Sequence, residues 1–347
     1  MISIKGVGDF FSLDIGTNSV RAVQLSQSKD GTWGLVGLGY VNVEPQLILS
    51  ESEESRKKLG SIISTMIGQS DIKTKNVAIG LSSQKTFTTI VDMPNQDPKE
   101  LERTVKYQID QFIPMSVDDA KFDWAILGQS PKDESLQEVL IASTAKSYSE
   151  ERLEFIENLG FNVIAAEPDS LSMSRALALP DAVPQLIVDF GENSTDISIV
   201  AGGNPRLVRT IPVGLHALVK SATQNLNIKE DQAEQFILKF GLAKDKLEGQ
   251  VFRAIETTLE NFAQEITKSA KFFSNKYPGS QIGVIVLSGF AGSIPQFGEY
   301  IASKVGVQTV SGNPFQNVKI PAKFNQLVQD HGSEFAVAMG LAKRSVK

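Results

Sequence analysis

The stretch LDIGTNSVRAV, residues Leu13–Val23, decides the predicted fold, because a related stretch returns later in the chain. VDFGENSTDISIV, residues Val188–Val200, repeats the pattern Asp-x-Gly-x-Asn-Ser between an apolar segment and an alternating one. The offset, 189 − 14 = 175, is about half of the 347 residues. Asp-Gly and Asn-Ser are common in hairpins, so one copy alone would be a weak signal. Two copies at half-chain spacing predict two related halves.

Each copy is expected to be a β-hairpin, since β-branched and apolar residues flank the turn on both sides. Gly16 and Gly191 allow a bound group to approach the backbone, and consecutive amides in such turns can bind an anion such as phosphate. Asp14 and Asp189 each end a buried strand. We expect them on two sides of one cleft, with a hydrated Mg²⁺ between them.

Arg21 follows the first turn, and two interpretations of it remain open. Its fixed positive charge could reach back to a phosphate oxygen, or it could be an exposed arginine of the hairpin. A third glycine-rich turn, SGFAGSIP (288–295), follows the apolar strand IGVIVL (282–287). The next residues, PQFGEYIASKV (295–305), predict a helix with Pro295 near its first turn. Joined to the two hairpins, this turn would form the third wall of a nucleotide cleft.

Composition narrows the possible chemistry. The chain has 41% hydrophobic and 21% charged residues, which is typical of globular proteins, and its length predicts two or more packed units. It has no cysteine, which excludes disulfides and thiolate chemistry. The two histidines, His216 and His331, have no partner motif, so we expect ordinary packing or surface roles for them. The groups that remain for binding or catalysis are carboxylates, hydroxyls, backbone amides and Mg²⁺.

Charge and hydropathy exclude two kinds of partner. The formal net charge is −6 and no long run of Lys and Arg occurs, so we expect no nucleic-acid partner. The longest strongly apolar stretch, residues 282–287, is far shorter than the ~18 residues of a membrane span. Asp9 and Asp14 interrupt any apolar leader segment. A cytoplasmic location without a membrane span is therefore expected.

Between the motifs, the hydrophobic pattern predicts two insertions. A β-α-β-β-α block follows Gln84 and runs to about Gly160, and amphipathic helices lie between the second hairpin and the strand IGVIVL. Two further segments, AEPDSLSMSRALAL (166–179) and EFAVAMGLAKR (334–344), are rich in small residues. They are either helices that cross between the halves and allow a hinge, or simple alanine-rich core helices.

This ordered set of motifs resembles the actin-like ATPase superfamily, which has an α/β, ribonuclease H-like fold with two related lobes around a nucleotide cleft. The two hairpins look like its first and second phosphate motifs, LSGFAGSIP like its adenosine motif, and the two small-residue segments like its connecting helices. The chain is similar more closely to the PilM family of type IV pilus assembly proteins. ERTVKYQIDQFIP and DWAIL fall in the inserted block, in the position that this family shares with the division protein FtsA.

The resemblance implies four subdomains. They are 1A, residues 1–84 with 161–184; 1C, residues 85–160; 2A, residues 185–215 with 281–347, its C-terminal connecting helix returning to the first lobe; and 2B, residues 216–280. It also implies ATP and Mg²⁺ as ligands, and a PilN-type N-terminal peptide in a groove between 1A and 1C. Strand addition and a helix in a groove would both suit that peptide.

The resemblance also assigns residues to the nucleotide site. The first phosphate motif contributes Asp14, Gly16, Thr17, Asn18, Ser19 and Arg21, the second Asp189, Gly191, Asn193 and Ser194, and the adenosine turn Gly289, Phe290 and Gly292. Glu234 matches a usual ribose contact, although Ile237 stands where relatives carry Lys, and Phe290 replaces a second glycine, where it would crowd or stack on the purine.

Glu167 falls where ATP-hydrolysing relatives keep a water-positioning acid, or it is a carboxylate favoured by the start of a helix. Because no strong base constellation appears, we expect slow or absent hydrolysis, with ATP holding the two halves closed.

Three functions compete at this point. The first is an ATP-binding cytoplasmic component of the pilus inner-membrane platform. It would be recruited to the inner face of the membrane and would link a PilN-type protein to the pilus motor ATPases. The sequence leaves open whether it forms oligomers or filaments. The second is a small-molecule kinase of the superfamily, for which no catalytic Asp is found beyond the metal pair. The third is an FtsA-like division scaffold. The chain ends directly after its connecting helix, which argues against the amphipathic membrane helix of that family.

Overall fold

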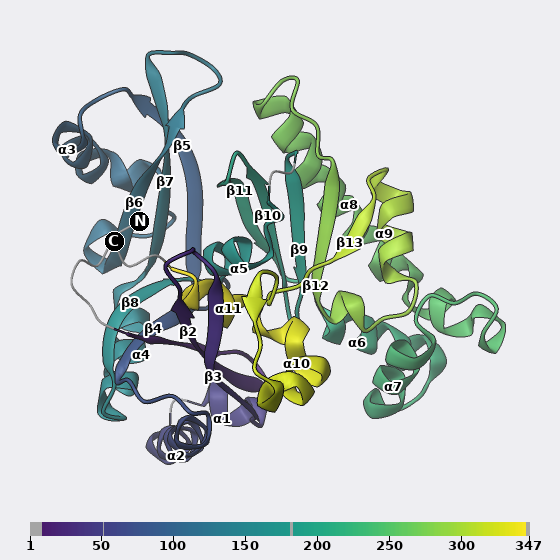
Figure 1. Ribbon diagram of the computed structural model, residues 1–347. Coiled ribbons are helices and arrows are strands. Elements are labelled where there is room, and N and C mark those ends of the chain that lie inside the picture. The colour runs from purple at the N-terminus through teal and green to yellow at the C-terminus, as the bar shows by residue number, and fades with distance from the viewer. Residues whose placement is uncertain (1–8, 51, 181–182, 345–347) are drawn as a thin grey trace. The chain divides into compact units, whose positions relative to one another are not determined.

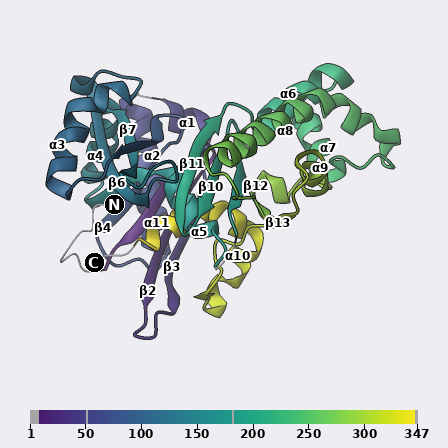
Figure 2. The ribbon, with the colours of Figure 1, turned by 90° about the horizontal axis from the view of Figure 1, so that it is seen from above.

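The computed structural model describes residues 9–50, 52–180 and 183–344. The chain divides into two compact units. Unit 1 comprises Met1–Ala176 with Pro314–Lys347, and unit 2 comprises Leu177–Asn313. Each unit is built around a mixed β-sheet with helices against it (Figures 1 and 2). The α/β class that the resemblance implied is therefore confirmed.

Unit 1 contains a six-stranded sheet in the order β14-β3-β2-β1-β4-β8. β1, β2 and β3 form an antiparallel meander, and the other three strands pair in parallel with their neighbours. Its strands are β1 (Phe11–Ile15), β2 (Ser19–Gln27), β3 (Trp33–Asn42), β4 (Asn76–Leu81), β8 (Asn162–Pro168) and β14 (Val318–Lys319).

One face of this sheet packs against α2 (Glu53–Gln69), which follows the short α1 (Pro45–Leu49). Ser52 caps the helix, its side chain accepting a hydrogen bond from the Ser55 N–H. The apolar face of α2 joins the alternate residues of β1 and β2 in one core, made of Phe11, Leu13, Val20, Ala22, Leu59, Ile63, Met66 and Ile67 with others. α4 (Lys146–Asn158) also packs there through Ile156. α4 also contacts β6 and β7, and the predicted boundary at residue 160, which places α4 in the inserted block, stays a prediction.

The other face of the sheet packs against α11 (Ala336–Ala342), which contacts β1, β2 and β4. α11 also packs closely against α5 (Asp169–Leu177), backbone to backbone. The contact is so close that a Cβ at Gly340 would overlap the Ser172 carbonyl group. Arg175 of α5 donates a hydrogen bond to the Gly340 carbonyl at 2.6 Å. The close contact expected of the two small-residue helices is confirmed, whereas their role in a hinge stays a prediction.

The inserted block forms a three-stranded antiparallel sheet in the order β5-β7-β6. Its elements are β5 (Thr86–Pro94), α3 (Pro98–Gln108), β6 (Ala120–Gln129) and β7 (Leu136–Ala145). Asp97 caps α3 by accepting hydrogen bonds from the N–H groups of Lys99 and Glu100. Leu101 and Val105 of α3 are buried against Met93, Val139 and Ile141 of the sheet, as the helical spacing predicts.

Unit 2 repeats the strand order of unit 1. Its five-stranded sheet runs β11-β10-β9-β12-β13, which corresponds to β3-β2-β1-β4-β8, with the same antiparallel meander followed by parallel strands. The strands are β9 (Gln185–Phe190), β10 (Thr195–Ala201), β11 (Asn204–Ile211), β12 (Val284–Gly289) and β13 (Thr309–Ser311). Two halves with one topology confirm the relationship inferred from the sequence repeat.

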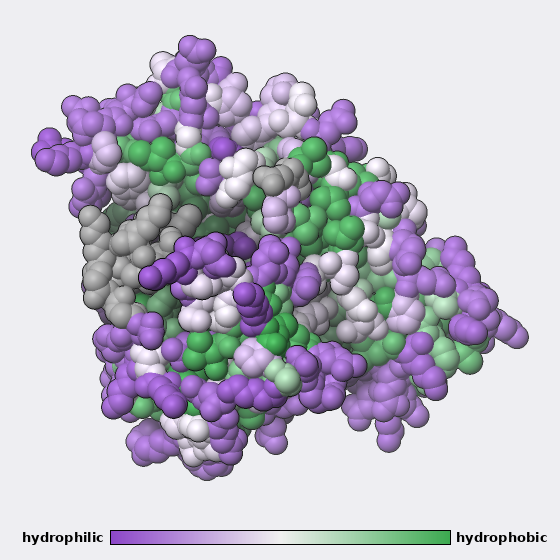
Figure 3. Space-filling view, viewed as in Figure 1, coloured by the Kyte–Doolittle hydropathy of each residue, from purple (hydrophilic) through white to green (hydrophobic). Residues whose placement is uncertain are grey.

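The helices of unit 2 surround a large aromatic and aliphatic core. Phe190, Phe262 and Phe297 pack against one another, with ring centroids 4.9 to 5.9 Å apart. α7 buries Ala233 and Ile237, and its outer surface is mainly hydrophilic (Figure 3). The helices are α6 (Leu215–Leu226), α7 (Glu230–Phe240), α8 (Gln250–Lys276) and α9 (Phe297–Val305). In the part of the chain that the structure describes, no helix is both long and apolar enough to cross a bilayer.

Residues 314–347 belong to unit 1, whereas the sequence assigned 281–347 to the second lobe and returned only the last helix to the first. The reason is that β14 pairs with β3, and α10 (Asn325–His331) follows it before α11. The chain leaves unit 1 after Ala176 and re-enters at Pro314. Both points are anchored within unit 1, because Gln316 donates to the Ala176 carbonyl at 3.0 Å and Lys343 Nζ donates to the Pro314 carbonyl at 3.1 Å.

Lys343 gives a prediction for pH dependence. Burial lowers the pKa of this lysine to about 8. Between that value and its unfolded pKa of about 10.4, the unfolded chain holds a proton that the folded protein has lost, so stability rises with pH. We expect Lys343→Met to remove a rise of about 1 to 2 kcal/mol, allowing for partial solvent screening, between pH 7.5 and 10. Urea unfolding of this variant and of exposed Lys29→Met measures it; equal pH slopes in the two variants would contradict the assignment.

Candidate functional site

The first predicted phosphate turn joins β1 to β2. Asp14 and Arg21 lie opposite each other in the register of this hairpin. The Gly16 N–H donates to the Ser19 carbonyl at 3.0 Å and closes the turn. A Cβ at Gly16 would lie 2.7 Å from Arg21 Nη1 and 3.3 Å from the Ser19 carbonyl oxygen, so a larger residue here would displace the Arg21 guanidinium. The Gly16 amide is thus used within the turn, and any anion would be bound by the residues that follow it.

The second turn, between β9 and β10, has the same construction at the same offset of 175. Asp189 lies opposite Asp196 in the register, and the Gly191 N–H donates to the Ser194 carbonyl at 3.0 Å. A Cβ at Gly191 would lie 2.8 Å from that carbonyl oxygen. The position equivalent to Arg21 is Asp196, which accepts a hydrogen bond from Thr210 at 2.6 Å. Only the first turn therefore carries an arginine at this position.

The second turn also contacts the start of α6, which the sequence did not reveal. The N–H groups of Leu215 and His216 donate to the carbonyls of Gly191 and Glu192 at 3.0 and 2.9 Å. A Cβ at Gly214 would lie 2.5 Å from both of these carbonyl oxygens. These two N–H groups of the first turn of α6 are therefore used to fasten the helix to the second turn. Gly214 is a lone glycine without a motif, so its role appears only in three dimensions.

The third turn follows β12 and lies beside the second. Gly289 has a φ of +65°, and a Cβ there would lie 2.5 Å from the Phe190 carbonyl oxygen and 3.0 Å from Asp189 Oδ1. Phe290 packs partly buried against the core of unit 2. Gly292 has room, since its Cβ would meet only Ser311 Oγ at 4.0 Å. Pro295 directly precedes Gln296, the N-cap of α9, so it lies near the first helical turn, as the sequence predicted.

Glu234, the predicted ribose contact, lies on α7 close enough to act on Glu192. Burial raises the pKa of Glu192, the charge of Glu234 raises it further, and His216 lowers it. These three side chains and the second and third turns belong to one unit. Ile237 is fully buried in the core. An apolar side chain at this position contributes to the packing of α7.

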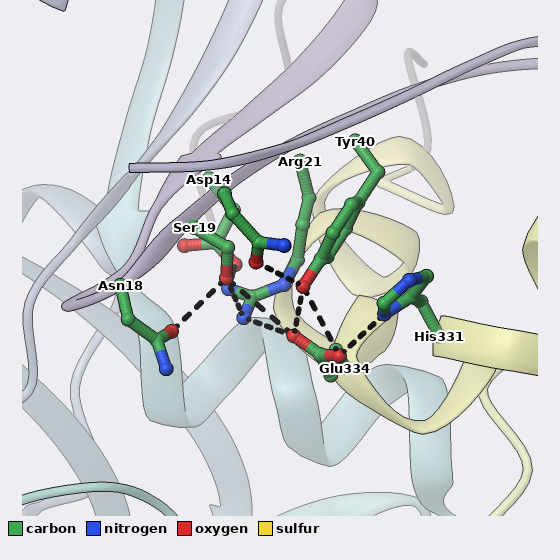
Figure 4. Close-up of polar contacts among 8 residues, drawn as sticks. Asp14, Asn18, Ser19, Arg21, Tyr40, His331 and Glu334 are labelled. Atoms are coloured by element: carbon green, nitrogen blue, oxygen red, sulfur yellow. Dashed lines mark hydrogen bonds and ion pairs between the residues drawn. The ribbon is translucent and has the colours of Figure 1, made fainter. Parts of the chain in front are cut away.

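Arg21 is held in a buried polar network (Figure 4). Its Nη1 donates to Asp14 Oδ2 at 3.0 Å, and its Nη2 donates to Ser19 Oγ at 2.6 Å and to Glu334 Oε2 at 3.0 Å. Only 12% of its side chain is exposed. Burial would lower the pKa of Arg21, but Asp14 and Glu334 outweigh burial and raise it. The interpretation of Arg21 as an exposed hairpin arginine is therefore wrong.

Three members of this network were missed in the sequence. Glu334 lies between α10 and α11, and Tyr40 and His331 contact its carboxylate. The Tyr40 and His331 rings stack with centroids 4.0 Å apart, so the packing role expected of His331 is only part of its contribution. Burial would raise the pKa of Glu334, but His331 and Arg21 outweigh it and hold the pKa below its usual value. Glu334 is 313 residues from Arg21, and no local pattern could have linked them.

Glu167 stands at the end of β8 and is buried. Its two oxygens accept hydrogen bonds from Arg175 at 2.7 and 3.1 Å, and Oε2 accepts another from Arg344 at 2.9 Å. The Glu167 carboxylate is therefore already engaged by two guanidinium groups. These ion pairs join β8, α5 and the end of α11, so a structural role accounts for Glu167, and water positioning stays a prediction.

The structure allows a test of how well these residues fit ATP and Mg²⁺. A Cβ at Gly16 of unit 1 would strike Arg21, and one at Gly191, Gly214 or Gly289 of unit 2 would strike backbone, so the packing of the turns themselves favours glycine at these positions. Within the described residues, no group of three His, Asp or Glu side chains could hold a metal ion directly. A hydrated Mg²⁺ bound through phosphates is compatible with that donor set. Asp14 belongs to unit 1 and Asp189 to unit 2, and their shared metal site stays a prediction.

Comparisons with known proteins agree on one family and one fold. The profile of the family described as type IV pilus assembly protein PilM matches residues 12–346. A solved PilM-PilN type IV pilus biogenesis complex has a TM-score of 0.81 at 21% identity, covering 98% of this chain and 99% of that one.

Two further structures share the fold at lower similarity. They are the ethanolamine utilization protein EutJ from Carboxydothermus hydrogenoformans (TM-score 0.55, 11% identity, 97% and 89% coverage) and MreB5 of Spiroplasma citri bound to ADP (0.55, 12%, 96% and 94%). At these identities the likenesses concern the fold alone, and they confirm the actin-like ATPase fold expected from the motifs.

Proposed function

Because the chain belongs to the family of type IV pilus assembly proteins PilM, we propose that it is the ATP-binding component of the pilus inner-membrane assembly platform. One observation carries the nucleotide part of this proposal. Two turns of identical construction, each closed by a Gly N–H to Ser carbonyl hydrogen bond, follow an aspartate at equivalent places in two sheets of the same topology. A single pair of phosphate-binding turns, one from each unit, explains this repetition.

In this proposal the aspartates, the glycines, Ser19 and Arg21 of the two turns have defined tasks. ATP with its hydrated Mg²⁺ supplies the charge that the two turns grip. Asp14 and Asp189 would accept hydrogen bonds from the water shell of the ion, and Gly16 and Gly191 would allow the tight turns that follow these aspartates. Ser19 and Arg21 donate to phosphate oxygens. The proposed sugar contact, Glu234, and the glycines Gly214 and Gly289 accompany the second turn.

The partner part of the proposal rests on the family and on the inserted sheet. The related solved structure is a complex of PilM with PilN, and we infer that this chain likewise binds a PilN-type N-terminal peptide. The strand order β5-β7-β6 makes β5 and β6 edge strands, which supports strand addition over helix binding. The chain would then work at the inner face of the cytoplasmic membrane and link that protein to the pilus motor ATPases.

Calorimetric titration of Mg-ATP and of the peptide into the protein tests both parts. Asp14→Asn preserves the shape of the side chain and removes its charge. We expect this variant to lose about 10- to 100-fold in Mg-ATP affinity while its affinity for the peptide without nucleotide is unchanged. The exposed ion-pair residue Asp71 gives a matched control, Asp71→Asn, expected to bind as the wild type does.

Two results would contradict the proposal. Equal Mg-ATP affinity in wild type and Asp14→Asn would exclude the first turn from the site. Failure of the wild type to bind either ligand would remove the proposed function altogether.

A further inference from the structure

Four side chains converge on the carboxylate of Glu334. Arg21 Nη2 lies 3.0 Å from Oε2, Tyr40 Oη 3.1 Å from Oε2, and His331 Nδ1 2.9 Å from Oε1. Ser19 Oγ lies 3.4 Å from Oε2 (Figure 4). A guanidinium, a phenol, an imidazole and a serine hydroxyl are also donors that hold phosphate oxygens. Glu334 is therefore an anion of the protein itself, seated among donors suited to phosphate.

Two of these donors belong to the first phosphate turn. Ser19 begins β2, and Arg21 is paired with Asp14 in the hairpin register. Both were assigned to phosphate binding from the sequence, yet both are engaged by Glu334, which comes from the segment between α10 and α11. A phosphate that uses the same donors has to share them with the carboxylate or displace it.

The net charge makes it unfavourable for a phosphate and the Glu334 carboxylate to share Ser19 and Arg21. Arg21 carries one positive charge between the two carboxylates of Asp14 and Glu334, so these three groups sum to −1. Glu334 contributes the unbalanced negative charge, because Asp14 alone already neutralises Arg21. An incoming polyphosphate adds negative charge beside this excess, and like charges at close range are repulsive.

Exposure shows which carboxylate can give way. The Asp14 side chain is 5% exposed, whereas that of Glu334 is 29% exposed. Arg21 Nε is buried and, among the described residues, has no hydrogen-bond partner, so the guanidinium keeps an unused donor. Glu334 is therefore the carboxylate of the pair that solvent can reach more easily, and Arg21 Nε is a donor that neither carboxylate uses.

We propose that Glu334 is a specificity-determining residue, which competes with nucleotide phosphate for Ser19 and Arg21 and so makes ATP binding depend on Mg²⁺. This inference rests on the proposed ATP site. Mg²⁺ cancels two charges of the triphosphate, which relieves the repulsion from the Asp14–Arg21–Glu334 group. ATP without the ion is repelled by the negative charge of this group and has to compete with Glu334 for Ser19 and Arg21.

Titration of ATP with and without Mg²⁺ into the full chain tests this inference through Glu334→Gln. The amide keeps the shape and the ability to accept from Arg21 and His331 but removes the charge. We expect its affinity for Mg-free ATP to rise about 10-fold and its affinity for Mg-ATP to rise about 3-fold, so that dependence on Mg²⁺ shrinks. A merely structural glutamate would give the opposite sign, since its loss would weaken the site.

Two further variants make the result decisive. Glu334→Asp keeps the charge but shortens the side chain, and we expect an affinity between those of wild type and Glu334→Gln. The exposed Glu157→Gln, on α4 of the same unit, changes the net charge equally and is expected to bind as the wild type does. Thermal melts verify that each variant is folded.

Each outcome then decides. If the wild type binds Mg-ATP and Glu334→Gln binds ATP no more tightly than the wild type does, this inference is overturned and the proposed function is left intact. If neither wild type nor any variant binds, both fall. Binding of ATP by Glu334→Gln alone would contradict ATP binding by the wild type, and with it the proposed dependence on Mg²⁺.

Discussion

Replacing Gly340 by alanine is expected to lower the free energy of unfolding by about 3 to 5 kcal/mol. The added Cβ would overlap the Ser172 carbonyl group, which is backbone and cannot rotate away. Relief requires α11 to move off α5, which would also break the hydrogen bond from Arg175 to the Gly340 carbonyl. Urea unfolding followed by circular dichroism measures the loss.

Gly68 supplies the matched control. It also lies in a helix, α2, but it is exposed, and a Cβ added there would have no atom within 4 Å. Gly68→Ala is therefore expected to leave stability unchanged or raise it by up to about 1 kcal/mol, through the better helix propensity of alanine. Equal effects of the two substitutions would show that α5 and α11 do not meet as closely as described.

Removal of Arg21 is expected to cost about 3 to 5 kcal/mol of stability at pH 7. Arg21→Met leaves the carboxylates of Asp14 and Glu334 near each other without the guanidinium that compensates them. Low pH should act in opposite directions on the stability of the wild type, in which Glu334 is paired with Arg21, and on that of the variant, in which it is not. Because the folded pKa of Glu334 lies below its unfolded value, its contribution is present above about pH 4.5 and is lost as pH falls through the folded pKa. The difference between wild type and variant should therefore shrink in acid.

Two comparisons separate charge burial from a general effect of losing an arginine. Arg56→Met breaks an exposed ion pair with Glu151, whose side chains are 42% and 52% exposed, and should cost less than about 1 kcal/mol. The triple change Asp14→Asn, Arg21→Met and Glu334→Gln removes both stranded charges and should recover most of the loss. A cost for Arg21→Met no larger than for Arg56→Met would contradict the buried network.

Much of the fold could be read from the chain because it depends on neighbours in sequence. The hairpins around residues 16–19 and 191–194 follow from glycine and polar residues between apolar strands, and their equivalence follows from the repeat itself. The helices α2 and α8 follow from apolar spacing, since one buried face must recur every three or four residues. Boundaries were less certain where tertiary pairing decides them, as with the return of residues 314–347 to unit 1.

The candidate site divides in the same way. Its glycines and aspartates could be named beforehand, because a turn that approaches a bound group needs them at fixed spacing. Glu334, Tyr40 and Gly214 could not, because each acts on a residue from another element and carries no motif of its own.

By itself, the sequence determined the repeated turn, the two halves and the family, all of which are properties of local pattern and order. Only the tertiary structure decided that a carboxylate 313 residues away occupies the donors of the first turn, and that Gly340 must be glycine because Ser172 lies against it. The physical reason is that charge and packing act through space over a few ångströms, whereas sequence patterns report only on the residues nearby along the chain.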